Sequence, residues 1–479
     1  MSRKSLSRRA VLGATTALIP FPVWFAEYGA KANPPLVRYS AQSTQGAAML
    51  TKYSTGVAQM MAKTAGDPGS WTFQWFTHAV RGDSTKMCQL SMLPSSQQPL
   101  ASAMWDTCQA HTNWTMEDFF LPWHRMFVYF FERIVRKACG DETFTLPYWD
   151  YTDSAQRALP SPFYTPTSGN PLYSANRNPG INTGTPIDHG IFPPPINTNL
   201  GVMVEGSYSP VSNHGGFNMD LDQGLHGSVH VLVGNSNGMA QVPWAANDPI
   251  FWLHHCNIDR LWASWDRCVG TNPTSSSWLN KTFIFADENG HQVVATVQDF
   301  NAITQLNYTY DRFYPYNFRQ CFAHVIQRNS QTIMASGLPT GKFALSGSNT
   351  FQTQLTTQGQ IFFKKDLRRL PARDAAQLVI RGLYAPVTPG VLYAVYIGPS
   401  AQQFVGYLNF FNATPMPGMT MKGRNDGRFF SFDVTSALRA LGHVADDQPF
   451  PVTISPVGTP DADATYGSIH SIELVVMEK

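Results

Sequence analysis

The chain lacks most of the features that mark specialised protein classes. Its 479 residues contain six cysteines, too few for a disulfide scaffold in a chain of this length. No cluster of lysine and arginine suggests a nucleic-acid surface, and there are no internal repeats or low-complexity tracts. Because 31 Phe, 18 Tyr and 12 Trp are present, the sequence predicts a globular protein with large cores. Its length allows roughly two or three domains.

The cysteine and glutamate signatures of common metal sites are also missing. The sequence contains no CxxC pair and no HExxH, and its expected helices lack the Glu-x-x-His pairs of di-iron carboxylate proteins. Histidines are instead concentrated in two motifs, 111–132 and 226–260, with His78 upstream. Together they supply seven imidazoles, of which six form two sets of three, which suits a pair of metal ions. Such ligands suit copper, zinc, nickel or iron, and the missing glutamates favour copper over iron.

The first 32 residues are predicted to be a leader rather than part of the fold. Arg8 and Arg9 precede an apolar run at 10–21, and Ala30-Lys31-Ala32 offers a cleavage site. The run is too short to span a membrane, so it predicts a twin-arginine signal and an exported protein, periplasmic or secreted. The alternative is a cytosolic protein with a chance basic leader. No other stretch is long and apolar enough to span a bilayer.

Four segments are expected to be helices that carry the histidines. They are 59–80, ending near His78; 120–137; the segment of His226 and His230; and 249–267. His226 and His230 are four residues apart, so both rings would lie on one helix face within reach of one ion. His255 and Asp259 have the same spacing. Asp259 would therefore orient the ring or an adjacent arginine, or form a buried ion pair with Arg260.

The C-terminal third has a different character. Short β-rich runs follow one another at 377–381, 391–397, 404–411, 429–434, 451–454 and 472–476. We therefore expect an α-helical four-helix-bundle domain at 33–335, which holds the metal site. An all-β domain, a sandwich of jelly-roll-like character, would follow at 345–479. A loop at 161–219, rich in Pro, Gly and Asn, either shapes the mouth of the site or decorates the surface.

Two motifs closely resemble the copper signatures of the tyrosinase, catechol oxidase and haemocyanin family. They are Phe120-Leu-Pro-Trp-His124-Arg125 with Glu132, and Asp248-Pro-Ile-Phe251 with His255, Asp259, Arg260 and Trp262. The segment from His226 to His230 looks like the start of the second copper site. The resemblance covers about 78–262. It implies two copper ions per chain and O2 as co-substrate, with His78, His111 and His124 on one copper and His226, His230 and His255 on the other.

The resemblance assigns roles to residues around these ligands. His254 would pack beside the site, and Phe251 would line the substrate pocket one turn before His255. His111 departs from the family pattern, because it lies slightly farther before His124 than the corresponding ligand of relatives does. It is nevertheless the nearest candidate in the sequence.

Three further positions bear on specificity. Asp222 stands four residues before His226, where plant relatives often have a glutamate that holds a water. It would take the phenol proton, directly or through a water, or else be a helix-terminal carboxylate without a catalytic role. Gly227 stands where relatives with strong monophenol activity often carry asparagine, which puts that activity in question. Val242 takes the position of a bulky gate in some plant catechol oxidases, so its small side chain would leave the entrance open.

The cysteines do not match the thioether pattern of many relatives, in which a cysteine is linked to the middle histidine. A disulfide between Cys88 and Cys108 and a pair of buried free thiols are the alternatives. Cys256, next to His255, is expected in the core.

The resemblance extends beyond the copper motifs. Tyr308-Thr309-Tyr310 looks like the motif that closes the catalytic domain of plant polyphenol oxidases, and Arg38 matches an arginine that stacks on it. The β-rich runs loosely resemble the plant C-terminal domain, which covers the copper site and keeps the enzyme latent. Here that domain would be either such a lid or a stabilising domain only.

The resemblance implies a tyrosinase, which hydroxylates small monophenols at the ortho position and oxidises o-diphenols to o-quinones. Catechol oxidase or o-aminophenol oxidase activity, without monophenol hydroxylation, is the alternative. A non-enzymatic oxygen carrier is more remote. A dizinc or other metal hydrolase is also remote, because its site would usually include bridging carboxylates. Neither a nucleic acid nor a membrane span is expected, whereas an oligomer stays possible.

Overall fold

The computed structural model describes residues 34–478, except for 106–118, 189, 192, 197–199, 211–214, 269, 315–329, 340, 371–374, 412 and 414–427. The expected leader and His111 therefore lie outside the described residues. From Leu36 onward the chain forms one compact unit. A search of the described segments finds no helix that is long and apolar enough to cross a membrane.

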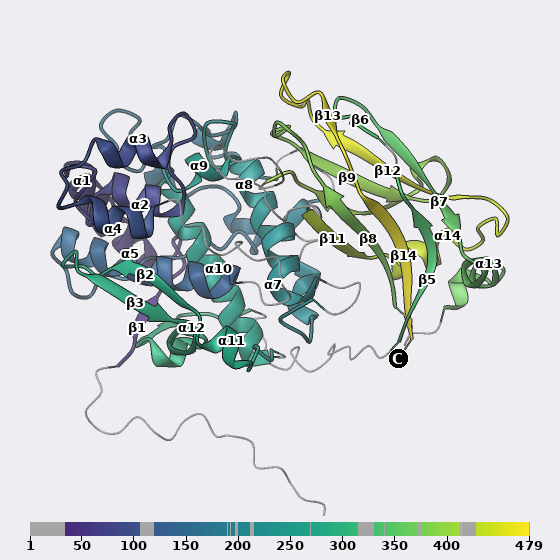
Figure 1. The fold of residues 1–479 in the computed structure, drawn as a ribbon, viewed down its shortest axis with the longest axis horizontal. Coiled ribbons are helices and arrows are strands. Elements are labelled where there is room, and N and C mark those ends of the chain that lie inside the picture. The colour runs from purple at the N-terminus through teal and green to yellow at the C-terminus, as the bar shows by residue number, and fades with distance from the viewer. Residues whose placement is uncertain are drawn as a thin grey trace, which may run out of the picture. The chain divides into compact units, whose positions relative to one another are not determined.

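Most of the regular secondary structure in the first two thirds of the chain is helical (Figure 1). The helices are α1 (Thr44–Met61), α2 (Trp71–His78), α3 (Lys86–Ser91), α4 (Gln98–Met104), α5 (Phe120–Cys139), α7 (Gly216–Asp220), the π-helix η6 (Leu221–His226), α8 (Gly227–Val233), α9 (Val242–Ala245), α10 (Ile250–Cys268), α11 (Ser276–Leu279) and α12 (Val297–Phe300). Strand β1 (Leu36–Arg38) pairs in parallel with β4 (Tyr308–Tyr310), and β2 (Thr282–Ala286) pairs with β3 (Gln292–Thr296).

The helices that carry the histidines follow the sequence prediction, with one correction. The single helix expected over 59–80 is wrong, because α1 ends at Met61 and α2 begins at Trp71. The connection contains Pro68, which lacks an amide hydrogen and disfavours a helical residue before it. Ser70 then starts α2, since its hydroxyl accepts a hydrogen bond from the backbone of the new helix.

Helices α5 and α10 form the centre of this region. Aromatic side chains on α5 pack against α10, and the rings of Phe131 and Trp252 stack with centroids 3.4 Å apart. The contact continues toward the start of α5, where Phe127 meets Trp252 at 4.6 Å. The same packing places His124 of α5 opposite His255 of α10. Apolar packing of two predicted helices thus brings the two histidine motifs together.

The chain ends of the helical part are joined by Arg38. Its guanidinium carbon lies 3.8 Å above the ring of Tyr308, which confirms the predicted cation–π contact. Arg38 also pairs with Glu132 at 2.8 Å and with Asp259 at 3.1 Å. Strand β1 is therefore fixed to α5, α10 and β4 at once.

The loop at 161–219 is anchored by Arg177. This buried side chain donates to both carboxylate oxygens of Asp248, at 2.9 and 2.7 Å, and to the backbone oxygens of Phe163 and Leu172. Asp248 in turn accepts a hydrogen bond from the amide of Ile250, at the start of α10. The loop is thus tied to the helix that carries His255.

The C-terminal part is built on an eight-stranded sheet. The strands are β5 (Ser330–Gly337), β7 (Asn349–Leu355), β8 (Ala375–Leu383), β9 (Leu392–Ile397), β10 (Gln403–Leu408), β11 (Arg428–Asp433), β12 (Phe450–Val457) and β14 (Ser471–Glu478). Their order is β10-β9-β12-β7-β5-β14-β8-β11. Short strands β6 (Phe343–Ala344) and β13 (Tyr466–Gly467) form a separate pair, and α13 (Thr357–Phe363) and α14 (Thr435–Leu441) complete this part.

All six predicted β-rich runs coincide with strands of this sheet. Strands β5 and β7 were missed, and β5 lies before the expected domain start at 345. The strand expected over 404–411 ends at Leu408, so residues 409–411 lie beyond β10. A helical domain followed by a β domain is therefore confirmed, whereas the four-helix-bundle and jelly-roll details stay predictions.

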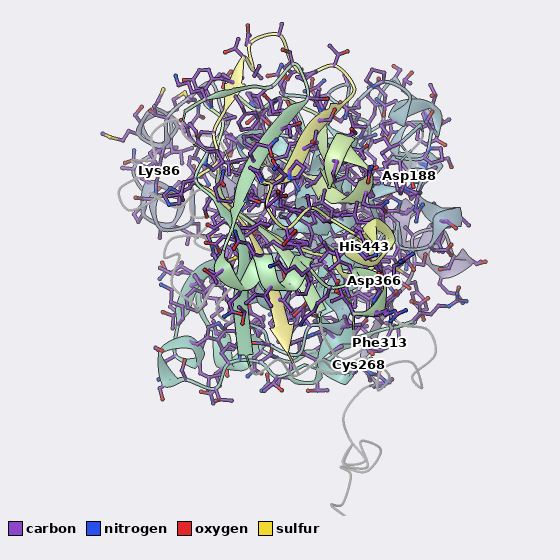
Figure 2. The ribbon with its side chains drawn as sticks, turned by 90° about the vertical axis from the view of Figure 1, so that its right-hand side faces the viewer. Lys86, Asp188, Cys268, Phe313, Asp366 and His443 are labelled. Atoms are coloured by element: carbon purple, nitrogen blue, oxygen red, sulfur yellow. The ribbon has the colours of Figure 1, made fainter. Side chains whose placement is uncertain are left out.

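The cysteines differ from the expected pairing. Cys88 is a free, exposed thiol, so a disulfide between Cys88 and Cys108 is wrong; Cys108 itself lies outside the described residues. Cys268, labelled in Figure 2, is disulfide-bonded. Cys256 is buried in the core as expected, and burial raises the pKa of its thiol to about 12.

Candidate metal centre

Five of the six predicted ligands lie within the described residues, and they come from four helical segments. His78 ends α2, His124 lies in the second turn of α5, His226 and His230 lie on η6 and α8, and His255 lies on α10. Each of the five is at most 3% exposed. The structure therefore gathers these five imidazoles in one buried place, and the place of His111 stays a prediction.

The two sets of histidines meet at α5 and α10. The rings of His124 and His255 stack with centroids 4.3 Å apart, and the ring of His226 lies 5.0 Å from that of His255. His78 lies 5.8 Å from His124. Phe251, one turn before His255, fits between the sets, at 4.9 Å from His78 and 4.2 Å from His255.

Hydrogen bonds fix the orientation of three of these rings. The Nδ1 atoms of His78, His124 and His230 lie 3.2, 2.8 and 2.8 Å from the backbone oxygens of Val242, Phe120 and Met239. A carbonyl oxygen only accepts, so each Nδ1 carries the hydrogen and donates it. In the neutral ring the lone pair then resides on Nε2, as in the histidine ligands of metal proteins.

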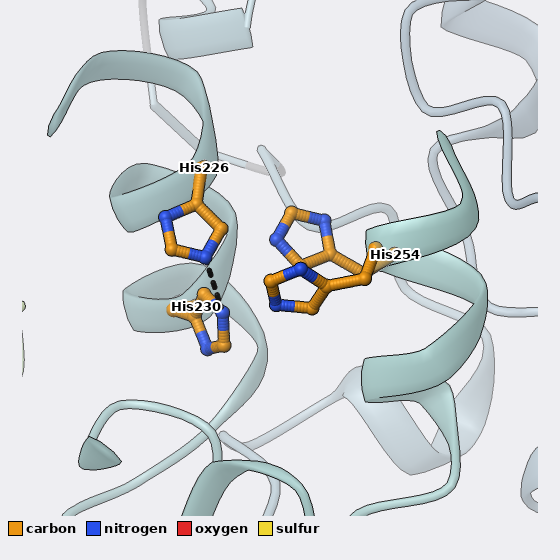
Figure 3. A group of neighbouring side chains, drawn as sticks. His226, His230 and His254 are labelled. Carbon is orange, nitrogen blue, oxygen red and sulfur yellow. Dashed lines mark hydrogen bonds between the residues drawn. The ribbon is translucent and has the colours of Figure 1, made fainter. Parts of the chain in front are cut away.

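His226 and His230 show a contact that a metal ion would explain. Figure 3 shows the two rings converging, with their Nε2 atoms 3.0 Å apart. Since the Nδ1 atoms of both rings are already donors, this contact would bring two lone pairs together. Two nitrogens at this separation can each lie about 2 Å from one ion, the usual length of a metal–imidazole bond.

His255 and His254 add nitrogen atoms without partners. Both ring nitrogens of His255 and the Nε2 atom of His254 are buried. None of these three atoms has a hydrogen-bond partner among the described residues. Buried polar atoms are rarely left this way. Ligand atoms of His226, His230, His254 and His255 all lie within 4.8 Å of one another. These residues fit a bound metal, and an all-imidazole set suits copper.

Burial keeps the centre in the protonation state that metal binding needs. Burial, together with the neighbouring imidazoles, lowers the pKa of His230, His254 and His255 well below the usual range for histidine. These rings are therefore neutral near pH 7. Neutral imidazoles bind metal without having to release a proton.

His254 lies closer to the centre than the sequence interpretation placed it. Its Nδ1 is hydrogen-bonded to the hydroxyl of Tyr151 at 2.8 Å, and its ring stacks 5.3 Å from that of His226. Tyr151 was not predicted from the sequence, because the contact joins residues 103 positions apart. The Tyr151 hydroxyl thus fixes the orientation of His254 within the group.

Asp259 is not hydrogen-bonded to His255, whose ring nitrogens have no partner among the described residues. Its carboxylate pairs with Arg38 and Arg125 and accepts hydrogen bonds from the hydroxyls of Tyr308 and Tyr310. Burial alone would raise the pKa of Asp259, but the two arginines hold it below its usual value. Asp259 lies on α10, Arg125 lies on α5 and Arg38 lies on β1. These ion pairs therefore connect α5 and α10 to the chain ends of the helical part.

The ion pair between Asp259 and Arg260, one of the two expected readings, is wrong. Arg260 pairs with Asp150 at 2.6 Å instead. Consecutive residues of a helix point in different directions, so Arg260 and Asp259 meet different neighbours.

Asp222 lies behind the ring of His226. Its Oδ1 is 3.0 Å from the Nδ1 of His226, on the side of the ring away from Nε2. Its Oδ2 is 3.4 Å from the Nη1 of Arg428, a side chain from β11 that is fully buried. This geometry suits a carboxylate that orients His226. Its role as an acceptor of the phenol proton stays a prediction.

The residues that follow β10 reach the centre and were not predicted from the sequence. The ring of Phe411 stacks on His230 with centroids 4.0 Å apart and an interplanar angle of 14°, and it meets His226 edge-on at 5.4 Å. The amide of Asn409 donates to the backbone oxygen of Gln223 at 2.6 Å. We call residues 409–411 the lid segment. Long-range docking of this kind leaves no periodic signal in a sequence.

Two predicted pocket residues, Gly227 and Val242, lie next to the lid segment and His78, respectively. A Cβ atom added at Gly227 would lie 2.4 Å from Oδ1 of Asn409, so the lid segment occupies the space that a side chain at 227 would fill. Val242 is 5% exposed and orients His78 through its backbone oxygen. Its role as an open gate stays a prediction.

Comparison with known proteins gives consistent matches. The profile of the common central domain of tyrosinase matches residues 68–200 and 198–268, and the polyphenol oxidase middle domain matches 272–320. Tyrosinase HcTyr1 of Hahella sp. (strain CCB-MM4) is 27% identical over 470 residues, which cover 88% of this chain and 96% of that protein. The chloroplastic polyphenol oxidase of Vitis vinifera is 30% identical over 412 residues, 77% of this chain and 65% of that protein.

A solved structure shares the fold over nearly the whole chain. Latent apple tyrosinase superposes with a TM-score of 0.60 at 22% identity, covering 93% of this chain and 98% of that chain. The similarity includes both the helical part and the C-terminal β part. At this identity it is evidence for the fold alone.

Proposed function

Because this chain belongs to the tyrosinase and polyphenol oxidase family of copper-dependent oxidoreductases, we propose that it uses O2 to hydroxylate monophenols at the ortho position and to oxidise o-diphenols to o-quinones. The observation that carries the proposal is the buried group of imidazoles whose Nδ1 atoms are held by backbone oxygens. His78, His111 and His124 would hold one copper ion. His226, His230 and His255 would hold the other.

The bound coppers would supply the redox chemistry and the activation of O2. The chain's own residues supply the surroundings. Phe120 lies 4.7 Å from His124 and 4.6 Å from His226, and with Phe251 it keeps bulk water from the centre. The backbone hydrogen bonds hold the rings of His78, His124 and His230 at fixed angles, so that little reorganisation of these rings accompanies the reaction.

We further propose that the C-terminal domain is a lid over the site. Phe411 covers His230, a predicted ligand, in the place where a phenol ring would approach it. The lid segment is also held by a hydrogen bond from Asn409 to η6. A phenol would have to displace Phe411, so the intact chain would be latent. If the C-terminal domain only stabilises the fold, opening the chain should not raise its oxidase activity.

The catechol oxidase reading is the second candidate. Gly227 favours it, because it lacks the side chain that often accompanies monophenol activity in relatives. The same position contacts Asn409 in the closed chain, so a glycine here also serves the docking of the lid segment. If Gly227 marks a catechol oxidase, the opened chain should not hydroxylate a monophenol. If Gly227 serves only the docking of the lid segment, the opened chain should hydroxylate it.

Oxygen uptake by the copper-loaded chain tests the proposal. The substrates are a monophenol and the o-diphenol with the same ring substituent, given to the intact chain and to the chain opened by limited proteolysis. Uptake with both substrates supports a tyrosinase, and uptake with the diphenol alone makes the chain a catechol oxidase. Reversible O2 binding without turnover in the opened chain would make it an oxygen carrier.

The export proposal is separate from the chemistry. The predicted leader at 1–32 lies outside the described residues, and its twin arginines are the support for it. Replacement of Arg8 and Arg9 by lysine should keep the chain in the cytoplasm, as fractionation would show. Export of that variant at the normal level would contradict the proposal.

A further inference from the structure

The π-helix η6 carries His226 and is held from outside by the β domain. Its polar contacts with β11 and the lid segment include three that matter here. The amide of Phe429 donates to Oε1 of Gln223 at 2.6 Å, and Asn409 donates to the backbone oxygen of the same residue at 2.6 Å. Arg428 pairs with Asp222 at 3.4 Å. A π-helical turn is rare and is found frequently at functional sites.

The pair of Arg428 and Asp222 differs from the other two contacts, because it reaches a predicted copper ligand. Asp222 Oδ1 is hydrogen-bonded to Nδ1 of His226, and Asp222 Oδ2 faces Nη1 of Arg428. Both charged side chains are 1% exposed. The chain of contacts thus runs from β11 through Arg428 and Asp222 to His226.

Arg428 depends on this pair for its placement. Its side chain is fully buried, and its Nε and Nη2 atoms have no hydrogen-bond partner among the described residues. A buried guanidinium held so sparsely is costly unless its charge is balanced by a nearby carboxylate. Asp222 provides that balance, and Arg428 in turn fixes the direction of the Asp222 carboxylate.

We propose that the β domain is a structural part of the second copper-binding site, with Arg428 as a positioning residue that acts through Asp222 on His226. This inference rests on the proposed function, since it requires the copper ligands named there. It gives the β domain a second role beside that of a lid. Opening the lid would expose the centre. Removing Arg428 from its pair with Asp222 would instead weaken copper binding at the centre.

Copper retention tests the inference directly. The full-length copper-loaded chain is mixed with an excess of a copper chelator, and the release of each copper is followed in time. Arg428→Met should release one of its two coppers about 10- to 100-fold faster than the unaltered chain, the usual effect of removing a residue that orients a metal ligand. The other copper should leave at the unaltered rate. Arg428→Lys, which keeps the charge, should lie between the two.

Two controls separate this effect from a general loosening. Tyr407→Phe removes another contact between the two parts, the hydrogen bond from its hydroxyl to the backbone oxygen of Pro193, and leaves Asp222 untouched. Arg439→Met removes a half-buried arginine of the β domain from α14. Both should release copper at the unaltered rate. The thermal midpoints of the copper-free variants report whether each still folds.

The pairing itself is tested by combining substitutions. If Arg428 acts through Asp222, the double variant Arg428→Met/Asp222→Asn should release copper no faster than Asp222→Asn alone. Additive effects would overturn the proposed route. If Arg428→Met does not fold, Arg428→Lys and Asp222→Asn carry the test.

The outcomes distinguish this inference from the proposed function. If the unaltered chain binds two coppers and folded Arg428→Met releases both at the unaltered rate, the inference is wrong and the proposed function stands. If the unaltered chain binds no copper, both are wrong.

Discussion

The lid proposal predicts that Phe411→Ala activates the intact chain. Phe411 is 3% exposed and packs in the core of the helical part, whereas its neighbour Phe410 packs in the core of the sheet. Truncation of Phe411 should therefore weaken docking of the lid segment and leave the folding of the β domain largely unchanged. Phe410→Ala should do the reverse, which makes it a matched control.

The size of the effect follows from the packing that is lost. Replacing a buried phenylalanine by alanine costs about 3–5 kcal/mol, and the stacking on His230 contributes to that cost. Each 1.4 kcal/mol is a factor of ten in an equilibrium constant. The open fraction of the chain should rise about 100-fold or more, until nearly all chains are open.

Oxygen uptake with an o-diphenol measures this change. Untreated Phe411→Ala should approach the activity of the proteolytically opened chain, and opening it further should add little. Phe410→Ala should unfold at a lower urea concentration. If Phe411→Ala stays as inactive as the intact chain while its protease-opened form is active, the reasoning about the lid fails.

Three other predictions follow from the same structure. Gly227→Ala should raise the oxygen uptake of the untreated chain, because its Cβ would lie 2.4 Å from Oδ1 of Asn409; unchanged uptake would show that this contact does not hold the lid. His124→Ala should lose about half of the bound copper and all oxidase activity, and full copper with normal turnover would remove it from the ligands. Burial raises the pKa of Asp266 from its ordinary value of 3.8 to about 7, so the free energy of unfolding should fall as pH rises from about 4 to about 7, by no more than about 4 kcal/mol. Asp266→Asn should remove this pH dependence, as the unfolding free energies from urea titrations at pH 5 and pH 8 would show. An unchanged difference between the two pH values would contradict the prediction.

Local sequence signals predicted the helices at the site. The aromatic residues of α5 and the Asp248-Pro249 start of α10 fix two helices whose packing brings His124 and His255 together. The break after Met61 was missed even though Pro68 and Ser70 signal it, because apolar residues on both sides continued the pattern. The proline and the capping serine are thus local sequence signals of this helix break.

Contacts between distant parts of the chain could not be predicted in the same way. Asp259 and Arg260 are neighbours in sequence, yet their partners Arg38 and Asp150 are chosen by the fold. Phe411 follows a predicted strand, and nothing local shows that its ring turns toward His230 instead of the sheet core. Side chains that join two domains are selected by docking geometry, which has no period in the sequence.

Oxygen uptake by the copper-loaded, proteolytically opened chain on a matched monophenol and o-diphenol tests the central claim most directly. We expect two coppers per chain and rapid O2 consumption with the diphenol, together with slower consumption with the monophenol. A chain that holds two coppers, is open and consumes no O2 with either substrate would contradict the claim that this centre is a phenol oxidase.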